Sequence, residues 1–483
     1  MNFKFENIDV FLEKYIPFLF IALTLLLSLL RTPFYDETHA FVISQLNLSE
    51  IFYLSRIEGH PIFWYLLLKP FSNLNFYPYS MMLINWVFAS IMIFVFWKKA
   101  PFNNWIKLLL TFSYPFFQYF AVVSRPYALG VLAIFLLSIF YEKSLKRPIL
   151  YSLLLIFCAN ISVITFFVAF GFGILFLYEC YKNKLLFSKK TLLMWIIFAF
   201  GILLLACQFL FLETPKMQSA NAHSLFLKHF LYFVCLPFSD LENKNLNQIL
   251  LQLTTSVSFF YFIFLFFKKA KSSLFLMIFS CIPMIIMFLT IYIGDFWHYY
   301  FIFIAFICAL WINWDKFKNE KIANILLVLL IFFNMTSYSI TQNGKNQTNQ
   351  PIFYKKTLDI ILNNNDYKKS KLFCFNQYSH LAPGLLMYLK KENISLYDNH
   401  NNDRTSFEAI RNIQNDEYKI LKLDEFINYL DKNKNNYLIA TSNKTADYSS
   451  FDYTEGNKTI YFDLVEYHPE IYLLIYKLRY EIR

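Results

Sequence analysis

The chain has 483 residues, of which 57% are hydrophobic, and its mean hydropathy is +0.41. Repeated apolar runs of about 18–20 residues are long enough to cross the hydrocarbon core of a bilayer. Composition therefore excludes an ordinary soluble enzyme and indicates a polytopic membrane protein. The net charge of +11 comes mostly from short loops between apolar runs, which argues against a nucleic-acid-binding patch.

About eleven apolar runs predict membrane-spanning helices, so we expect a mainly α fold. In chain order these runs lie near 15–31, 79–97, 105–122, 127–141, 149–160, 163–181, 191–212, 250–267, 272–293, 297–313 and 322–340. The first run has no small-residue cleavage site after it, so we expect an uncleaved span. The cysteine spacing predicts neither disulfides nor a zinc site.

Basic residues alternate from loop to loop, which predicts the topology. Five loops are basic, at Lys98–Lys107, Lys143–Arg147, Lys182–Lys190, Lys268–Lys271 and Lys316–Lys321. Cytoplasmic loops carry the excess of Lys and Arg in membrane proteins. We therefore expect a multi-pass protein of the cell (inner) membrane, with a cytoplasmic N-terminus and an extracytoplasmic C-terminal part.

Two domains are expected, a transmembrane domain at 1–341 and a soluble extracytoplasmic α/β domain at 342–483. Within the first, residues 32–78 form an external loop. Its apolar pieces, 38–55 and 61–71, predict interfacial helices along the outer surface, because 61–71 is too short to cross. In the second domain, alternating patterns predict strands at 371–375, 394–398, 437–442 and 459–467, with helices at 382–391 and 423–432.

An acidic pair, Asp36 and Glu37, follows the first span directly. Carboxylates at the start of a helix accept backbone N–H groups and favour the positive end of the helix, which would explain the pair structurally. Their position at the membrane boundary also suggests a catalytic role. In that interpretation one carboxylate is a general base for an acceptor hydroxyl, and the other orients the acceptor or helps to bind a metal.

Three further candidates for substrate binding, His39, Arg56 and His60, lie in the same external loop. His39 follows Asp36 by three residues and would share a helical face with it, either as a simple polar contact or as an acid-base pair. Pro61 is explained by the preference for proline in the first turn of a helix. That preference explains His60 poorly.

Other candidates for substrate binding lie at external helix starts. Arg125 is either a membrane-interface anchor or a ligand for phosphate, and Tyr127 would add a hydroxyl donor. His298 is either an ordinary interfacial residue or a second phosphate contact, while Tyr299 belongs most economically to an aromatic belt. Lys216 is a weaker candidate in the external segment 213–249, which is a flap or a plain connection.

These residues, in this order, resemble the GT-C superfamily of polytopic glycosyltransferases, in the bacterial branch related to protein O-mannosyltransferases and lipid A aminoarabinose transferases. The similarity rests on Asp36-Glu37, on EGHPIFWYLLL at 58–68 and on SRPYAL at 124–129. It departs from the family at two places. Ile62 stands where a second proline is common, and His298-Tyr299 stands where Arg-Tyr is common.

The resemblance implies a GT-C fold and an inverting transfer of sugar from a polyprenyl-phosphate donor to a hydroxyl on the outer face. Asp36 would be the base, Glu37 an acceptor or motif-stabilising contact, and Arg125 a ligand of the lipid phosphate. The implied partners are this donor, a glycan, lipid or protein acceptor, and membrane lipid, with no nucleic acid. No cofactor is required, although a divalent cation is possible.

Two alternatives are open. A lipid-linked oligosaccharide flippase or other transporter would also be basic inside, but it would place charged residues within the spans near the midplane. Here the spans are nearly free of charge and the candidate residues lie outside them, which favours the enzyme. The second alternative is a non-catalytic relative that keeps the scaffold as a binding protein.

Overall fold

The computed structural model describes residues 5–31, 33, 35–58, 60–72, 74–209, 246–290, 296–340, 356–374, 382–398, 401–403, 405–406, 423–441, 450–468 and 473–482. It is mainly helical and contains one six-stranded sheet. The chain divides into two units. The helical unit comprises Met1–Leu30, Gly59–Trp64 and Met82–Gly344, and the sheet unit comprises Arg31–Glu58, Tyr65–Met81 and Lys345–Arg483.

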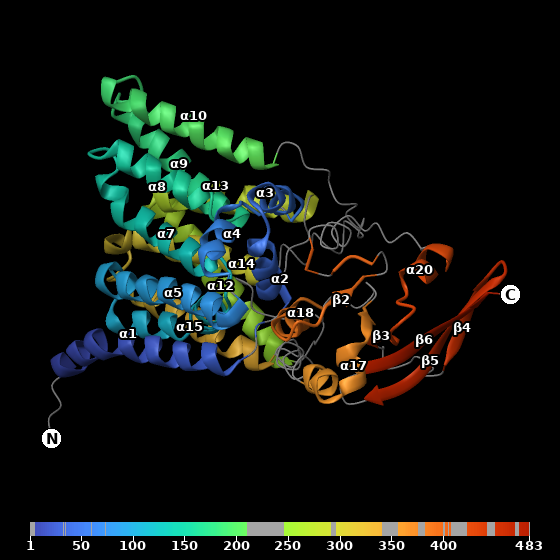
Figure 1. The fold of residues 1–483 in the computed structure, drawn as a ribbon. Helices are drawn as coiled ribbons and strands as arrows, with labels where there is room; N and C mark the ends of the chain where they lie inside the picture. The colour runs from blue at the N-terminus through green and yellow to red at the C-terminus, as the bar shows by residue number, and fades with distance from the viewer. Residues whose placement is uncertain are drawn as a thin grey trace. The chain divides into compact units, whose positions relative to one another are not determined.

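A helix forms at each of the predicted apolar runs (Figure 1). The helices are α1 (Phe5–Leu30), α5 (Tyr79–Lys99), α6 (Asn104–Thr111), α7 (Tyr127–Phe140), α8 (Pro148–Ala159), α9 (Val163–Lys182), α10 (Lys189–Phe209), α12 (Leu246–Lys269), α13 (Lys271–Thr290), α14 (Phe296–Trp311) and α15 (Lys321–Ile340). Within the described residues, five helices are long and apolar enough to cross a membrane, namely α1, α5, α9, α10 and α13. The chain is thus a membrane protein.

The predicted helix at 105–122 is wrong in one respect, because it is broken in the middle. Helix α6 ends at Thr111, and a π-helix, η3, occupies Pro115–Phe120. Proline has no N–H and cannot continue an α-helical hydrogen-bond ladder. The wider π-helical turn changes which side chains lie just before the Ser124–Arg125 connection, compared with a continuous α-helix. Such π-helical turns often lie beside functional sites.

Small residues let the helices of the helical unit approach closely. A Cβ added to Gly171 on α9 would lie 2.1 Å from Ser280 Oγ on α13, and one added to Gly130 on α7 would lie 2.3 Å from the Thr165 methyl group on α9. This is how apolar helices associate in lipid, where the hydrophobic effect provides little force between them. The side chains of α14 from Tyr299 to Leu310 are at most 3% exposed.

The expectation that Tyr299 belongs to an aromatic belt is therefore wrong. Its side chain is fully buried, and its ring lies 4.6 Å from that of Phe288 on α13. A belt residue would reach the boundary between lipid and water. A helix that is apolar all round is instead covered by protein, and α14 has this pattern.

The sheet unit contains most of the predicted external loop together with the C-terminal residues, whereas residues 59–64 of that loop belong to the helical unit. Its first helices are α2 (Tyr35–Gln45) and α3 (Leu48–Ile57), and it includes residues 65–68 of α4 (Phe63–Leu68). The predicted single helix at 38–55 is two helices, because Asn47 starts a new one. Its side chain accepts from the Glu50 N–H, and the Glu50 side chain accepts from the Asn47 N–H, both at 3.0 Å.

The six strands are arranged in the order β2-β1-β3-β6-β5-β4. They are β1 (Lys371–Phe373), β2 (Leu396–Tyr397), β3 (Asn436–Thr441), β4 (Phe451–Glu455), β5 (Lys458–His468) and β6 (Leu473–Ile482). Strand β1 is parallel to β2 and β3, and the remaining pairs are antiparallel. The long strands β5 and β6 are visible in Figure 1.

The four predicted strands are confirmed as β1, β2, β3 and β5, whereas β4 and β6 were not predicted. Every side chain of β4 is exposed, so that strand has no inward-facing apolar face to reveal it. Helix α18 (Ala382–Lys391) matches its prediction, and α20 (Leu423–Tyr429) ends earlier than expected. Within the sheet unit, α2 packs against α18, and the Tyr77 and Tyr388 rings lie 5.2 Å apart.

Candidate functional site

Four of the predicted substrate-binding residues meet inside the helical unit. One terminal nitrogen of Arg125 lies 3.3 Å from His60 Nε2, and the Tyr127 hydroxyl lies 3.2 Å from His298 Nε2. The Arg125 guanidinium also lies over the Tyr127 ring, 5.9 Å from its centroid. We call His60, Arg125, Tyr127 and His298 the polar cluster. Its members come from three segments that are far apart in sequence.

The backbone explains where three of these side chains lie. The Arg125 N–H donates to Val123 O at 2.9 Å in the connection between the π-helix and α7, and Tyr127 is the first residue of α7. His298 lies in the first turn of α14. The N-terminal ends of helices carry a partial positive charge, so both starts favour a negatively charged ligand over a cation.

The polar cluster is largely removed from solvent. Arg125 is 8% exposed, His298 5% and Tyr127 1%. A charged side chain in an apolar surrounding is expensive to keep, and such residues usually have a task. Arginine has N–H donors only, so His60 Nε2 is the acceptor in this contact.

The chemistry of the polar cluster suits an anion with several oxygen atoms. A guanidinium is permanently charged and offers five N–H donors in a planar fork, and phenol and imidazole groups add further donors. Hydrogen bonds from such groups to phosphate oxygens are charge-assisted and strong. The cluster is therefore a candidate phosphate-binding site.

An aromatic stack adjoins the polar cluster. The Tyr119 ring, from the π-helix, is stacked on Tyr127 with centroids 5.8 Å apart, and on Trp297 with centroids 5.7 Å apart. Tyr119 was not found from the sequence. The chain holds 34 Tyr and 59 Phe, so no single aromatic residue stands out in the sequence alone.

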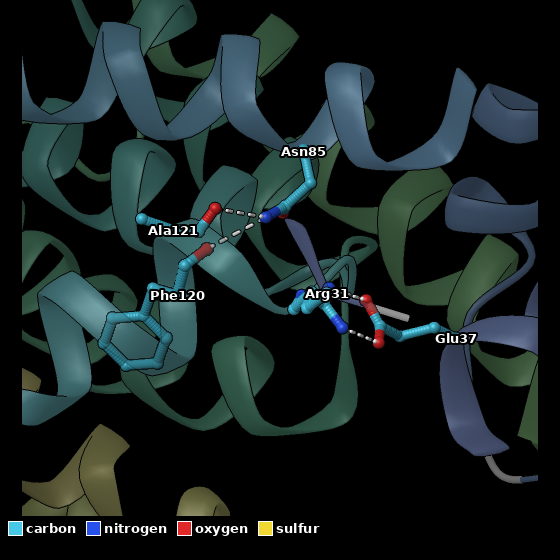
Figure 2. Close-up of polar contacts among 5 residues, drawn as sticks. All are labelled: Arg31, Glu37, Asn85, Phe120 and Ala121. Carbon is cyan, nitrogen blue, oxygen red and sulfur yellow. Dashed lines mark hydrogen bonds and ion pairs between the residues drawn. The ribbon is translucent and has the colours of Figure 1, made fainter. Parts of the chain in front are cut away.

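Asn85 on α5 supports the backbone that leads to Arg125. Its Nδ2 donates to Phe120 O and Ala121 O, each at 3.1 Å, and the residue is 1% exposed (Figure 2). These carbonyls lie at the end of the π-helix, where the last C=O groups of a helix need partners from outside it. The sequence signal was available, since a polar amide inside an apolar span usually has a function.

We expect Asn85→Leu to destabilise the protein, because two buried carbonyls lose their donor and each such loss costs about 1–3 kcal/mol. The measurement is the unfolding temperature of the purified protein in detergent. Ser90→Ala is the matched control, since Ser90 lies on the same helix and its hydroxyl donates to Trp86 O within that helix at 2.7 Å. Equal unfolding temperatures for both variants would contradict the supporting role of Asn85.

The acidic pair lies in the sheet unit, at the first turn of α2, and its two members have different surroundings. Glu37 is fully buried and forms a two-pronged ion pair with Arg31, with one of the two contacts at 2.6 Å (Figure 2). Asp36 is partly exposed. Glu37 thus ties the start of α2 to the end of the preceding segment, and Asp36 is the more accessible carboxylate.

Breaking the Arg31–Glu37 pair is expected to cost about 3 kcal/mol, because Glu37→Met leaves a partly buried guanidinium without its carboxylate. Unfolding in detergent should show this loss. The double variant Arg31→Met/Glu37→Met should recover most of it. The exposed pair Lys98–Glu13, whose side chains are 62% and 47% exposed, is the control, and its removal should change stability by less than about 1 kcal/mol. No recovery in the double variant would contradict the pairing.

His39 and Arg56 belong to the sheet unit, and the members of the polar cluster belong to the helical unit. His39 Nε2 lies 2.5 Å from Glu58 Oε1, and the Tyr65 hydroxyl donates to the same carboxylate. The expected neighbour of His39 was Asp36, and Glu58 was not among the candidates. Arg56 lies over the Phe52 ring, 5.8 Å from its centroid.

Two predictions are not tested by these contacts. Lys216 and most of the 213–249 segment lie outside the described residues. For metals, no group of three or more His, Cys, Asp or Glu side chains that could hold an ion occurs among the residues described above. The possible divalent cation stays a prediction.

The fold and the site together define a helical membrane protein with a sheet-containing unit and a buried, donor-rich polar cluster. No protein-family model matches the chain, and neither a curated protein nor a solved structure was found to be similar to it. Its function must therefore be argued from the site.

Proposed function

We propose that this protein is a membrane glycosyltransferase that moves a sugar from a polyprenyl-phosphate donor to a hydroxyl acceptor on the outer face of the membrane. The observation that carries the proposal is the polar cluster. A permanent cation, two imidazoles and a phenol are gathered in an apolar helical unit, from segments as far apart as His60 and His298. A lipid phosphate is an anion that reaches such a site from the bilayer.

The proposed reaction needs few groups. The acceptor oxygen attacks the anomeric carbon, the bond between that carbon and the phosphate oxygen breaks, and the polyprenyl phosphate leaves with the electron pair. Arg125 stabilises the negative charge that grows on this phosphate. The acceptor proton passes to Asp36 as general base. Attack opposite the leaving group inverts the configuration at the anomeric carbon. The polyprenyl phosphate leaves as an anion that Arg125 stabilises, so no second carboxylate is needed to protonate it.

The two acidic residues take different roles in this proposal. Glu37 is held by Arg31 and is fully buried, so it serves to fix the start of α2. Asp36 is partly exposed, and its carboxylate is the one that an acceptor can reach. This division supports Asp36 as the base and Glu37 as the residue that stabilises the motif.

The proposed arrangement in the membrane follows the GT-C layout of about eleven spans. Among the described residues, five helices meet the length and hydropathy of a span by themselves, and three shorter apolar helices, at Pro148–Ala159, Trp297–Trp311 and Lys321–Phe332, would add to them. The basic loops support a cytoplasmic N-terminus and a sheet outside the cytoplasm. The acceptor is a glycan, lipid or protein of the cell envelope.

The test is sugar transfer by the purified protein in lipid vesicles that contain a polyprenyl-phosphate sugar and candidate acceptors. The proposal expects a new glycosidic bond of inverted configuration and free polyprenyl phosphate in equal amounts. Movement of the intact lipid-linked sugar across the vesicle membrane without a new bond would establish the transporter instead. Binding without either reaction would establish a non-catalytic binding protein.

A further inference from the structure

A side chain from a helix distant in sequence anchors the turn after His60. The Ile62 N–H donates to Gln208 Oε1 at 2.9 Å, although the two residues are 146 positions apart. Gln208 lies near the end of α10 and is 6% exposed. Its Nε2 donates to Asn160 Oδ1 at 3.1 Å and to Leu204 O at 3.0 Å. Both ends of the Gln208 amide are thus engaged.

This anchor acts close to the polar cluster. Pro61 has no N–H, so the first backbone donor after it is that of Ile62. Proline also holds its φ near −65°, so the backbone between His60 and the Ile62 amide has little conformational freedom. A constraint on the Ile62 amide is therefore a constraint on where the His60 ring lies.

We infer that Gln208 is a positioning residue, which holds the turn at residues 60–62 so that His60 Nε2 accepts the hydrogen bond from Arg125. The inference deepens the proposed function and rests on it for the identity of the ligand, a lipid phosphate. Gln208 acts through His60 and has no contact with the reacting atoms. The bond depends on the residue type at position 62, because a proline there would have no N–H to donate.

A double-mutant cycle on the full-length protein in detergent tests the anchor without any substrate. The variants are Ile62→Pro, Gln208→Met and the two combined, and the readout is the rate at which diethyl pyrocarbonate modifies His60, measured on its peptide by mass spectrometry. His468 on β5, whose side chain is 27% exposed, is the internal reference. One net hydrogen bond corresponds to about a fivefold change in an equilibrium.

Each single variant should therefore raise the His60 rate by about fivefold, because the turn opens more often. The double variant should match the singles, since both remove the same bond, instead of multiplying their effects. Gln208→Glu keeps an oxygen that can accept from the Ile62 N–H, and its neutral carboxylic acid also keeps a donor. The rate of His60 modification in this variant should therefore stay near that of the wild type. An unchanged His60 rate in Gln208→Met would overturn the inference, because methionine preserves the volume of the side chain.

Transfer assays on the same proteins separate this inference from the proposed function. If both hold, Gln208→Met raises the donor KM by about fivefold and leaves the acceptor KM unchanged. If His60 reactivity changes as expected but the wild type transfers no sugar, the proposed function fails and the anchor stands. If Ile62→Pro does not fold, the comparison of Gln208→Met with Gln208→Glu still tests the inference. Methionine lacks the oxygen that accepts from the Ile62 N–H, whereas glutamate keeps it.

Discussion

Asp36→Asn is expected to reduce sugar transfer by about 10²–10⁴-fold, the usual contribution of a general base. Asparagine has nearly the same shape but cannot take up the acceptor proton. Donor binding should persist, since the phosphate ligand proposed here is Arg125. The measurement is the rate of transfer from a polyprenyl-phosphate sugar by purified protein at saturating donor, with protein abundance checked in the same membranes.

The control for this variant is Asp315→Asn, which makes the same chemical change at an exposed carboxylate paired with Lys318 at 2.7 Å. An exposed pair contributes less than about 1 kcal/mol, so this variant should be as active as the wild type. Full activity in Asp36→Asn would remove Asp36 from the mechanism. Glu37 or His39, which is 2.5 Å from Glu58, would then be the next residues to test as the base.

Arg125→Ala is expected to weaken use of the lipid donor by about 10–100-fold, because a hydrogen bond to a charged group contributes about 1.5–3 kcal/mol. The effect should fall on the donor KM and on kcat, since the same charge stabilises the leaving phosphate, whereas the acceptor KM should change little. Arg125→Lys keeps the charge and loses the planar fork, so its donor KM and kcat should lie between those of the wild type and those of Arg125→Ala. Initial rates over a matrix of donor and acceptor concentrations provide the measurement.

The matched control is Arg147→Ala, which removes an exposed arginine at the start of α8. Its kinetics should equal those of the wild type. If Arg125→Ala weakened the use of donor and acceptor equally, the result would argue that Arg125 only supports the fold. The direct readout is binding of polyprenyl phosphate without sugar, which should weaken in Arg125→Ala and not in Arg147→Ala.

Much of the fold could be predicted from the sequence because its signals are local. An apolar run long enough to span a bilayer makes a helix wherever it stands, since lipid offers the backbone no other hydrogen-bond partners. Alternating apolar residues likewise located β3 and β5. The break before Pro115 has a local cause, the proline itself, which the continuous apolar run concealed. The signals failed at the fully exposed strand β4, whose formation depends on its pairing with β5.

The candidate site was predictable as a set of residues and not as an arrangement. Arg125 and His298 stood out because charged or titratable side chains are rare beside apolar spans. Asn85 and Gln208 are polar amides inside apolar spans, which is a signal in the sequence. The backbone groups that they bind belong to other segments, and the sequence does not show which segments these are.

By itself, the sequence determined that this is a membrane protein, which segments are helical, and which charged side chains are costly enough to attract attention. The tertiary structure decided which of them meet. It gathered His60 and Arg125 with Tyr127 and His298, and it tied Glu37 to Arg31. The physical reason is range, because the energy of burying an apolar run depends on its own residues, whereas a hydrogen bond between distant segments depends on how the whole chain packs.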